Sequence, residues 1–129
     1  MSIRVAFDHQ AFVMQSFGGI SRYYTKLAEA LNRANVKSHI YAPYHRNYYL
    51  SNLDGNLSTG HYAKKFLPKT ASFINLMSSY RLKSYIEDYK PDLLHQTYYQ
   101  SNRYLQNDLP VIITVYDMIH ELFPQYFPP

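Results

Sequence analysis

Apolar residues along this chain follow two spacings, which predict strands and helices in turn. Short, nearly continuous apolar runs are typical of strands buried in a parallel sheet. Such runs predict five strands, at residues 3–8, 37–43, 61–67, 91–99 and 110–117. Pro43 is expected to end the second strand. The run PVIITVYD is the clearest of the five, and its β-branched residues favour a strand that is covered on both faces.

Two segments carry apolar residues at helical spacing. Residues 19–34 place their apolar side chains on one face, which predicts an amphipathic helix. Residues 70–89 also predict a helix, but its apolar side chains form two sets on roughly opposite faces: Phe73, Leu76, Met77 and Tyr80, and then Leu82, Tyr85, Ile86 and Tyr89. A straight helix would expose one set. We therefore expect a bend or break near Ser78–Ser79, or a helix buried on two sides.

The order of these elements predicts an α/β fold with a doubly wound parallel sheet, because strands alternate with helices. Right-handed crossovers place strand 3–8 at the centre, beside strand 91–99. The connection 9–17 is longer than usual, and 44–60 is predicted to be a loop. Ligands of such sheets bind at the carboxyl ends of the strands. Three segments leave that edge and carry most of the chemically interesting residues, at 8–19, 95–104 and 116–124.

The composition fits one globular domain. The 129 residues are 47% hydrophobic and 17% charged, which argues against a disordered chain. Cysteine is absent, so disulfides and cysteine-ligated metal sites are excluded. The sequence has neither an apolar run of membrane-spanning length nor a secretory layout at its N-terminus, and we expect a cytoplasmic protein. Fifteen tyrosines and no tryptophan are a bias that suits wet clefts and interfaces.

The positive charge is concentrated in one segment. Residues 60–90 hold six cations and two acids, and this difference of +4 equals the net charge of the whole chain. Such a patch can hold a protein near anionic lipid, at about 1 kcal/mol per cation close to the surface. The alternative is an ordinary solvated face. A peripheral contact with the inner face of a membrane therefore stays open.

The stretch SFGGISRYY places two of the four glycines, Gly18 and Gly19, at the start of the helix predicted over 19–34. The free N–H groups of a helix N-terminus favour an anion, and glycine lets a ligand approach the backbone closely. The stretch matches neither GxGxxG nor a P-loop. A tight turn into the helix is the alternative reading.

Polar side chains near the ends of two strands are the remaining candidates. His95 and Tyr98 belong to the segment 91–99, and Asp117 and His120 follow the run VIITV. Two histidines on adjacent strand ends favour a functional site, although a lone histidine is more often a hydrogen-bonded structural residue. Asp117 could instead cap the next turn.

Other chemistries fit the sequence poorly. Asp8 and His9 leave the central strand and could line the same cleft, but no HExxH or comparable spacing supports a metal site. GGISR does not match the G-x-S-x-G elbow of a serine hydrolase. KKFLPK is only a hint of the basic, aromatic stripe that nucleic-acid binding needs. We therefore expect no metal, no cofactor and no nucleic-acid partner.

Three blocks together resemble the N-terminal half of family 4 glycosyltransferases, most closely the bacterial members that build surface polysaccharides. The blocks are FGGISRYYTKLAEAL, PDLLHQTYY and PVIITVYDMIHELFPQYF, which occur in the family's order and lie within residues 3–127. Family members carry a similar GGI-SRY helix start and similar D-x-x-H-x-T-Y and TVHD-MIHE-FP strand ends. The resemblance implies the GT-B architecture, in which two Rossmann-like domains face each other across a cleft.

By this resemblance, the protein transfers a sugar with retention of anomeric configuration and without a required metal. A nucleotide sugar would be the donor, and a glycan or lipid-linked molecule the acceptor, in polysaccharide or lipopolysaccharide synthesis. Gly18 and Gly19 would lie against the donor diphosphate. The resemblance implies the substrate-binding residues Gly18, Gly19, Ser21, Arg22, His95, Tyr98 and Tyr116, and the catalytic residues Asp117 and His120.

Position 116 departs from the family pattern, which has histidine in TVHD where this chain has Tyr116. A tyrosine can donate a hydrogen bond but does not titrate near neutral pH. No histidine role is therefore transferred to Tyr116, and His120 is the better candidate for a polar contact in the cleft.

The chain is expected to be an incomplete N-terminal, acceptor-side domain, because no helix follows to cover the strand at 111–115. The donor-binding domain would then be missing, and residues 1–129 alone would be inactive. Two other functions stay open. One is a non-catalytic glycan- or nucleotide-binding module, and the other is a membrane-surface adaptor that uses the basic segment.

Overall fold

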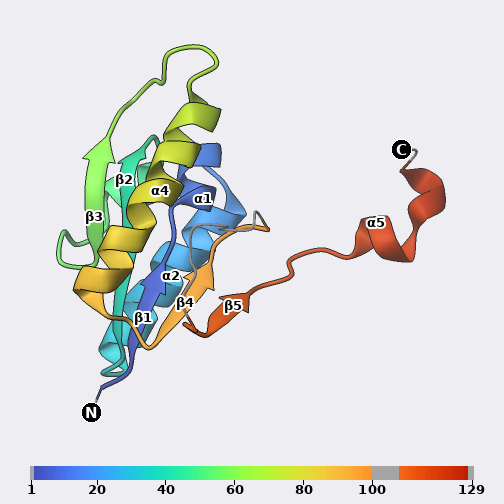
Figure 1. The fold of residues 1–129 in the computed structure, drawn as a ribbon. Helices are drawn as coiled ribbons and strands as arrows, with labels where there is room; N and C mark the ends of the chain where they lie inside the picture. Colours follow the sequence, from blue (N-terminus) through green and yellow to red (C-terminus); the bar gives the residue numbers. More distant parts are fainter. Residues whose placement is uncertain (1, 100–107, 128–129) are drawn as a thin grey trace.

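The computed structural model describes residues 2–99 and 108–127. Five parallel strands form one sheet in the order β3-β2-β1-β4-β5 (Figure 1). The strands are β1 (Arg4–Phe7), β2 (Lys37–His45), β3 (Ser58–Tyr62), β4 (Leu93–Gln96) and β5 (Val111–Ile113). The predicted doubly wound, Rossmann-like α/β fold is confirmed, with β1 at the centre and β4 beside it.

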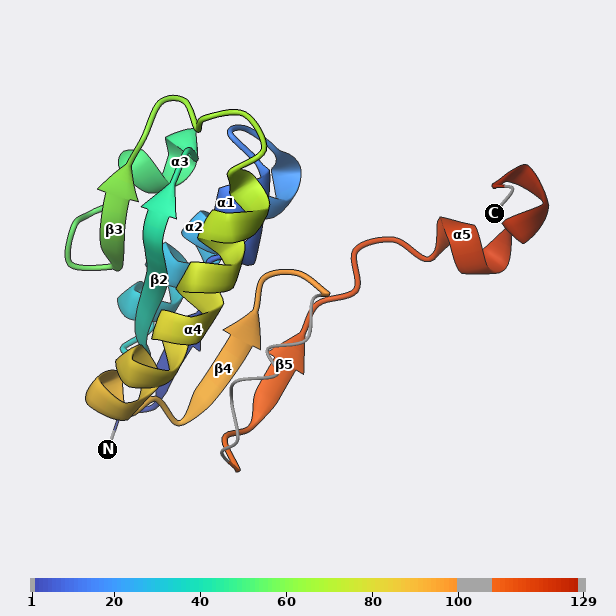
Figure 2. The same cartoon turned by 45° about the horizontal axis from the view of Figure 1, so that its top comes forward.

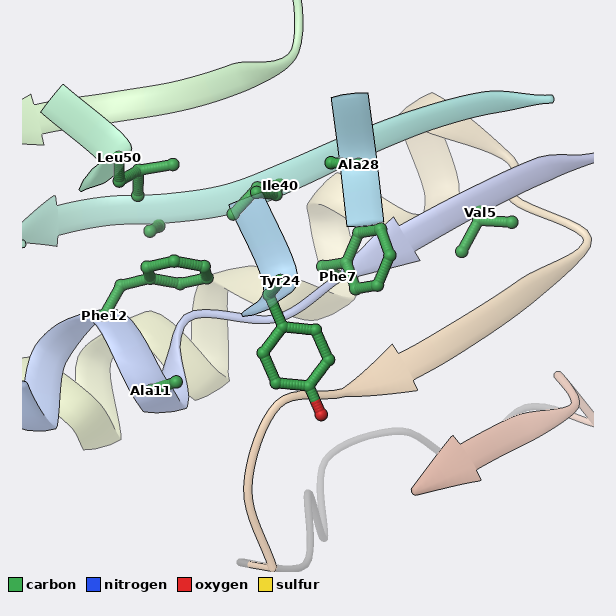
Figure 3. Close-up of a cluster of buried hydrophobic side chains, with 9 residues drawn as sticks. Val5, Phe7, Ala11, Phe12, Tyr24, Ala28, Ile40 and Leu50 are labelled. Atoms are coloured by element: carbon green, nitrogen blue, oxygen red, sulfur yellow. The ribbon is translucent and has the colours of Figure 1, made fainter. Parts of the chain in front are cut away.

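Two long helices cover the two faces of the sheet. Helix α2 (Gly19–Arg33) packs on one face and α4 (Ala71–Tyr89) on the other (Figure 2). Alternation along β1 explains both contacts, because Val5 and Phe7 point to the α2 side while Ala6 points to the α4 side. The larger core lies under α2, where Phe7, Phe12, Tyr24 and Ile40 are fully buried (Figure 3).

Two short helices lie where the sequence predicted irregular connections. Helix α1 (Gln10–Met14) lies within the predicted connection 9–17, and α3 (Tyr48–Ser51) lies within the predicted loop 44–60. Four of the five residues of α1 are buried, so it has no alternation of polar and apolar faces that could reveal it. Helix α3 begins at a side-chain cap, since Asn47 Oδ1 accepts a hydrogen bond from Leu50 N.

Strand β2 continues through Pro43 to His45, so the prediction that Pro43 ends it was wrong. The register between β2 and β3 shifts between Tyr41 and Tyr44, and a bulge of this kind accommodates a residue that has no N–H. Gly60 lies opposite, where an added Cβ would collide with the carbonyl of Ala42. The third strand lies at 58–62, earlier than the predicted 61–67.

Helix α4 runs without interruption from Ala71 to Tyr89, so neither the break near Ser78–Ser79 nor burial on two sides is found. Leu82 and Ile86 are buried against the sheet, while Phe73, Leu76 and Tyr80 are 65%, 53% and 71% exposed. Leu82 and Ile86 of the second set therefore form the inner face together with buried Ser78, while Phe73, Leu76 and Tyr80 of the first set lie outside.

Strand β5 is shorter and more exposed than predicted. It spans three residues, and Val111, Ile112 and Ile113 are each nearly half exposed. Helices α2 and α4 pack over β1, β2 and β4. The expectation that this strand is covered on both faces is thus not met in the part of the chain that the structure describes.

His45 makes the stability of the fold dependent on pH. It is buried, its Nδ1 accepts a hydrogen bond from Asn47 N at 3.3 Å, and burial lowers its pKa to about 4. In the unfolded chain the pKa is about 6.5, so between these values the unfolded state binds the proton more readily. Stability is therefore lost as the pH falls from 6.5 towards 4.

We expect His45→Asn, which keeps an acceptor near the Nδ1 position, to lose less stability than the wild type on acidification. The difference should be about 1 to 2 kcal/mol between about pH 7.5 and about pH 5. Urea unfolding at the two pH values measures it. Equal losses in both proteins would show that His45 does not titrate in this way.

Candidate functional site

The carboxyl ends of β1 and β4 are tied together by a buried carboxylate. Asp8 follows β1, is fully buried, and accepts hydrogen bonds at Oδ1 from Thr97 N (2.9 Å) and Thr97 Oγ1 (2.6 Å). Its Oδ2 accepts from Gln10 Nε2 at 2.6 Å. Thr97 Oγ1 in turn accepts from Ala11 N at 3.0 Å. These bonds fix the two strand ends against the start of α1.

Asp8 and His9 do not line an open cleft, contrary to expectation, because both are fully buried. His9 Nε2 lies 3.1 Å from the carbonyl of Asn75 and 3.3 Å from Ser79 Oγ on α4. Burial lowers the pKa of His9, which keeps the imidazole neutral at pH 7. Both residues support the site from below.

His95 joins β4 to the end of β5. Its Nε2 lies 2.8 Å from Thr114 Oγ1, and its ring stacks on Phe7 at 5.4 Å between centroids and meets the edge of Tyr24 at 5.2 Å. It is 8% exposed, and burial lowers its pKa, so the ring is neutral at pH 7. The structure thus places His95 at the predicted edge, in a fixed orientation and largely below the surface.

Tyrosines form the upper layer of this edge. Tyr116 packs edge-on against Tyr23 and Tyr24, with centroids 6.1 Å apart in both pairs, and its N–H donates to Tyr99 OH at 3.1 Å. Tyr98 is partly exposed, and its ring lies 5.1 Å from that of Tyr99. Burial raises the pKa of Tyr116 well above its usual value, so its phenol stays protonated. Tyr98 and Tyr116 thus belong to one cluster of aromatic rings that reaches His95 through Tyr24.

The start of α2 lies at the same carboxyl edge. Gln15 Oε1 accepts a hydrogen bond from Ser21 N at 3.4 Å, and Ser21 Oγ donates to the carbonyl of Gly18 at 3.1 Å. A Cβ added at Gly18 would collide with the Gln15 side chain, whereas at Gly19 it would meet nothing within 4 Å. A side chain at position 18 would displace the flexible end of Gln15, whereas one at position 19 would disturb nothing in the fold.

Open space at Gly19 leaves the helix end accessible. The N–H groups of Gly19 and Ile20 belong to the first turn and have no acceptor within the helix. Arg22 is exposed one turn further along, while Ser21 is buried. A helix end of this kind, with an arginine beside it, suits an anionic group.

The chain from Asp117 onward does not join this arrangement, although Thr114 and Tyr116 do. Helix α5 (Ile119–Leu122) and the 3₁₀ turn η1 (Pro124–Tyr126) lie apart from the sheet (Figure 1). Asp117 is exposed, and its Oδ1 accepts from Ile119 N at 2.7 Å, which is the capping role considered from the sequence. His120 belongs to α5, but its side chain lies outside the described part of the structure. Asp117 and α5 are thus not brought to the Gly18–Gly19 turn.

Three residues of this edge were missed by the sequence reasoning. Thr97 and Thr114 fix Asp8 and His95, and Gln15 fixes the first turn of α2. Thr97 and Thr114 each come directly after a strand, which is the signal that could have found them. Gln15 carried no such signal, because its role depends on how α1 and α2 are joined.

The described side chains of this edge can bind ligands through hydrogen bonds and charge. Within residues 2–99 and 108–127, no group of three or more histidine and carboxylate side chains could hold a metal ion. The buried imidazoles of His9 and His95 are neutral, and the phenols can only exchange hydrogen bonds. An anion at the α2 terminus and hydroxyl groups along the tyrosines are the ligands that this edge could take.

Comparison with known proteins identifies the family of this domain. Residues 17–129 match the family model described as Glycosyltransferase Family 4. No curated protein and no solved structure matches the chain. In the described residues, no helix is both long and apolar enough to span a lipid bilayer.

Proposed function

The chain belongs to glycosyltransferase family 4, and from this premise we propose that it transfers a hexose from a nucleotide sugar to a hydroxyl of a glycan or lipid-linked acceptor. The anomeric configuration would be retained. Bacterial surface polysaccharide or lipopolysaccharide would be the product, formed in the cytoplasm. The family supports the transferase class, and the resemblance of the three sequence blocks supports the finer assignment.

The accessible N-terminus of α2 carries this proposal. Departure of the nucleoside diphosphate leaves negative charge on its β-phosphate, and helix N–H groups aimed at that charge stabilise it. The open space at Gly19 would admit the diphosphate to within hydrogen-bond distance of the backbone. Arg22 and Ser21 would assist, Arg22 as a cation near the phosphates and Ser21 by holding the turn.

The tyrosine layer would hold the sugars. Tyr98 and Tyr116 would hydrogen-bond donor or acceptor hydroxyls, and His95 would keep this layer in place through Thr114 and Tyr24. Asp117 and His120 are proposed as the catalytic polar groups. This role requires Asp117 and helix α5 to lie over the carboxyl edge of the sheet when substrates bind.

The donor would also need a second domain. In the proposed arrangement, this domain supplies the acceptor side, and a second Rossmann-like domain holds the nucleoside across a cleft. Residues 1–129 alone are then expected to give no transfer.

Incubation of the full-length protein with a panel of UDP-, GDP- and dTDP-hexoses and a membrane extract tests the proposal. We expect one donor to be consumed, with a product whose anomeric proton shows the same configuration as the donor by NMR. An inverted product would contradict the retaining assignment. Tight binding of a nucleotide or glycan without any turnover would instead establish a non-catalytic module, and turnover by residues 1–129 alone would contradict the two-domain account.

A further inference from the structure

The outer surface of α4 and the segment before it carry large apolar side chains that face solvent. These side chains are exposed by 53% to 76%, namely Leu67, Phe73, Leu76 and Tyr80. The helix is already anchored to the sheet by Leu82 and Ile86 on its opposite side. The outer apolar residues therefore do not belong to either described core cluster of this domain.

Cations surround these apolar residues. Residues 64–83 contain five cations and no acid, and all five are exposed: Lys64, Lys65, Lys69, Arg81 and Lys83. Within residues 2–99 and 108–127, the structure forms an ion pair at Lys26–Glu29, away from this segment. The acids Glu87 and Asp88 follow one turn later, towards the other end of α4. We call residues 64–83 the basic-apolar surface.

The position of this surface relative to the site is fixed by topology. Helix α4 begins at the carboxyl edge of the sheet, and the segment that leads into it arches over that edge (Figures 1 and 2). The Gly18–Gly19 turn lies at the same edge. A flat partner that touched the basic-apolar surface would thus approach the edge of the sheet that carries the candidate site.

We propose that the basic-apolar surface binds an anionic lipid bilayer. Phe73, Leu76 and Tyr80 enter the headgroup region, where apolar and aromatic side chains gain most, and the cations contact lipid phosphates. The charge explains the choice of partner, because an apolar stripe ringed by cations without acids complements a surface that is both apolar and negative. Binding does not depend on sugar transfer, so it can be tested without a substrate.

Co-sedimentation of the purified protein with vesicles tests this proposal. We expect binding to phosphatidylcholine vesicles that contain phosphatidylglycerol, little binding to phosphatidylcholine alone, and release at high salt. Equal binding to vesicles with and without phosphatidylglycerol would overturn the proposal.

Two charge-matched variants separate this surface from the general positive charge of the protein. Lys64→Glu/Lys65→Glu should weaken binding more than about tenfold. Arg33→Glu/Lys37→Glu changes the net charge equally at exposed sites outside the basic-apolar surface, and should weaken it far less. Equal losses would mean non-specific attraction and would overturn the assignment to this surface.

A third variant tests insertion at constant charge. Phe73→Ser/Tyr80→Ser removes two exposed side chains, so the fold should persist, as circular dichroism can verify. We expect weaker vesicle binding than that of the wild type, and release at a lower salt concentration. Unchanged binding would overturn insertion, and concentration-dependent self-association of the wild type that these substitutions abolish, without lipid binding, would assign the surface to a second copy of the chain.

Discussion

Replacing Gly19 with valine in the full-length protein is expected to lower kcat/KM for sugar transfer by about 10² to 10³, while the domain stays folded. An added Cβ at position 19 meets no described atom, so the substitution creates no clash within the fold. It does place a branched side chain over the N–H groups of the first turn. A diphosphate could then no longer approach them, and the charge of the leaving group would lose its stabilising donors.

Gly55→Val is the matched control for this experiment. Gly55 also has open space around its Cβ position, but it precedes β3 and so lies at the amino edge of the sheet. We expect wild-type transfer from this variant and similar thermal unfolding for both. Full activity of Gly19→Val would eliminate the diphosphate contact, whereas unfolding of that variant would show that Gly19 is needed by the fold.

The largest loss of stability is expected from Asp8→Ala, at about 3 to 5 kcal/mol. The substitution leaves the N–H and hydroxyl of Thr97 and the amide of Gln10 without their buried acceptor. Buried donors without partners are costly, because water cannot replace the lost bond. Urea unfolding at neutral pH measures the change.

A double-mutant cycle with Thr97→Val identifies the bond responsible. If the Asp8–Thr97 pair carries the effect, the double variant should be more stable than the sum of the two single losses predicts. Asp54→Ala removes an exposed carboxylate that accepts from Asn56 N at 3.0 Å, and should cost about 1 kcal/mol or less. A loss at Asp8 no larger than at Asp54 would contradict the structural role of Asp8.

The sheet was predictable from two signals, namely the apolar pattern of each strand and the helices that lie between the strands in the sequence. In IRVAF, Ile3, Val5 and Phe7 are apolar at every second position, and Ala6 between the last two is apolar as well, which is typical of a strand covered on both faces. The covering helices appear between the strands in the sequence. Right-handed crossovers then leave few arrangements, and β1 at the centre follows. The three blocks that resemble the family indicated the class of function, but they did not indicate which side chains contact each other.

What could not be predicted depends on contacts between distant residues. Pro43 looked like a strand end, and only the bulge opposite Gly60 allows β2 to pass through it. Both apolar sets of α4 looked ready for burial, and nothing local shows which set meets the sheet. In the site, Thr97 gains its role from Asp8, 89 residues away, which no pattern within a window can reveal.

The sequence separation of Asp8 and Thr97 also affects how the domain folds while it is being synthesised. A ribosome adds about 5 to 20 residues each second, so Asp8 waits roughly 5 to 20 s for Thr97 to emerge. During that interval the central strand also lacks β4, since Val5, Ala6 and Phe7 pair with Leu93, Leu94 and His95. Until β4 emerges, the nascent chain therefore carries a central strand that can pair with β2 on one edge only, and this half-built sheet is the species that chaperones would meet.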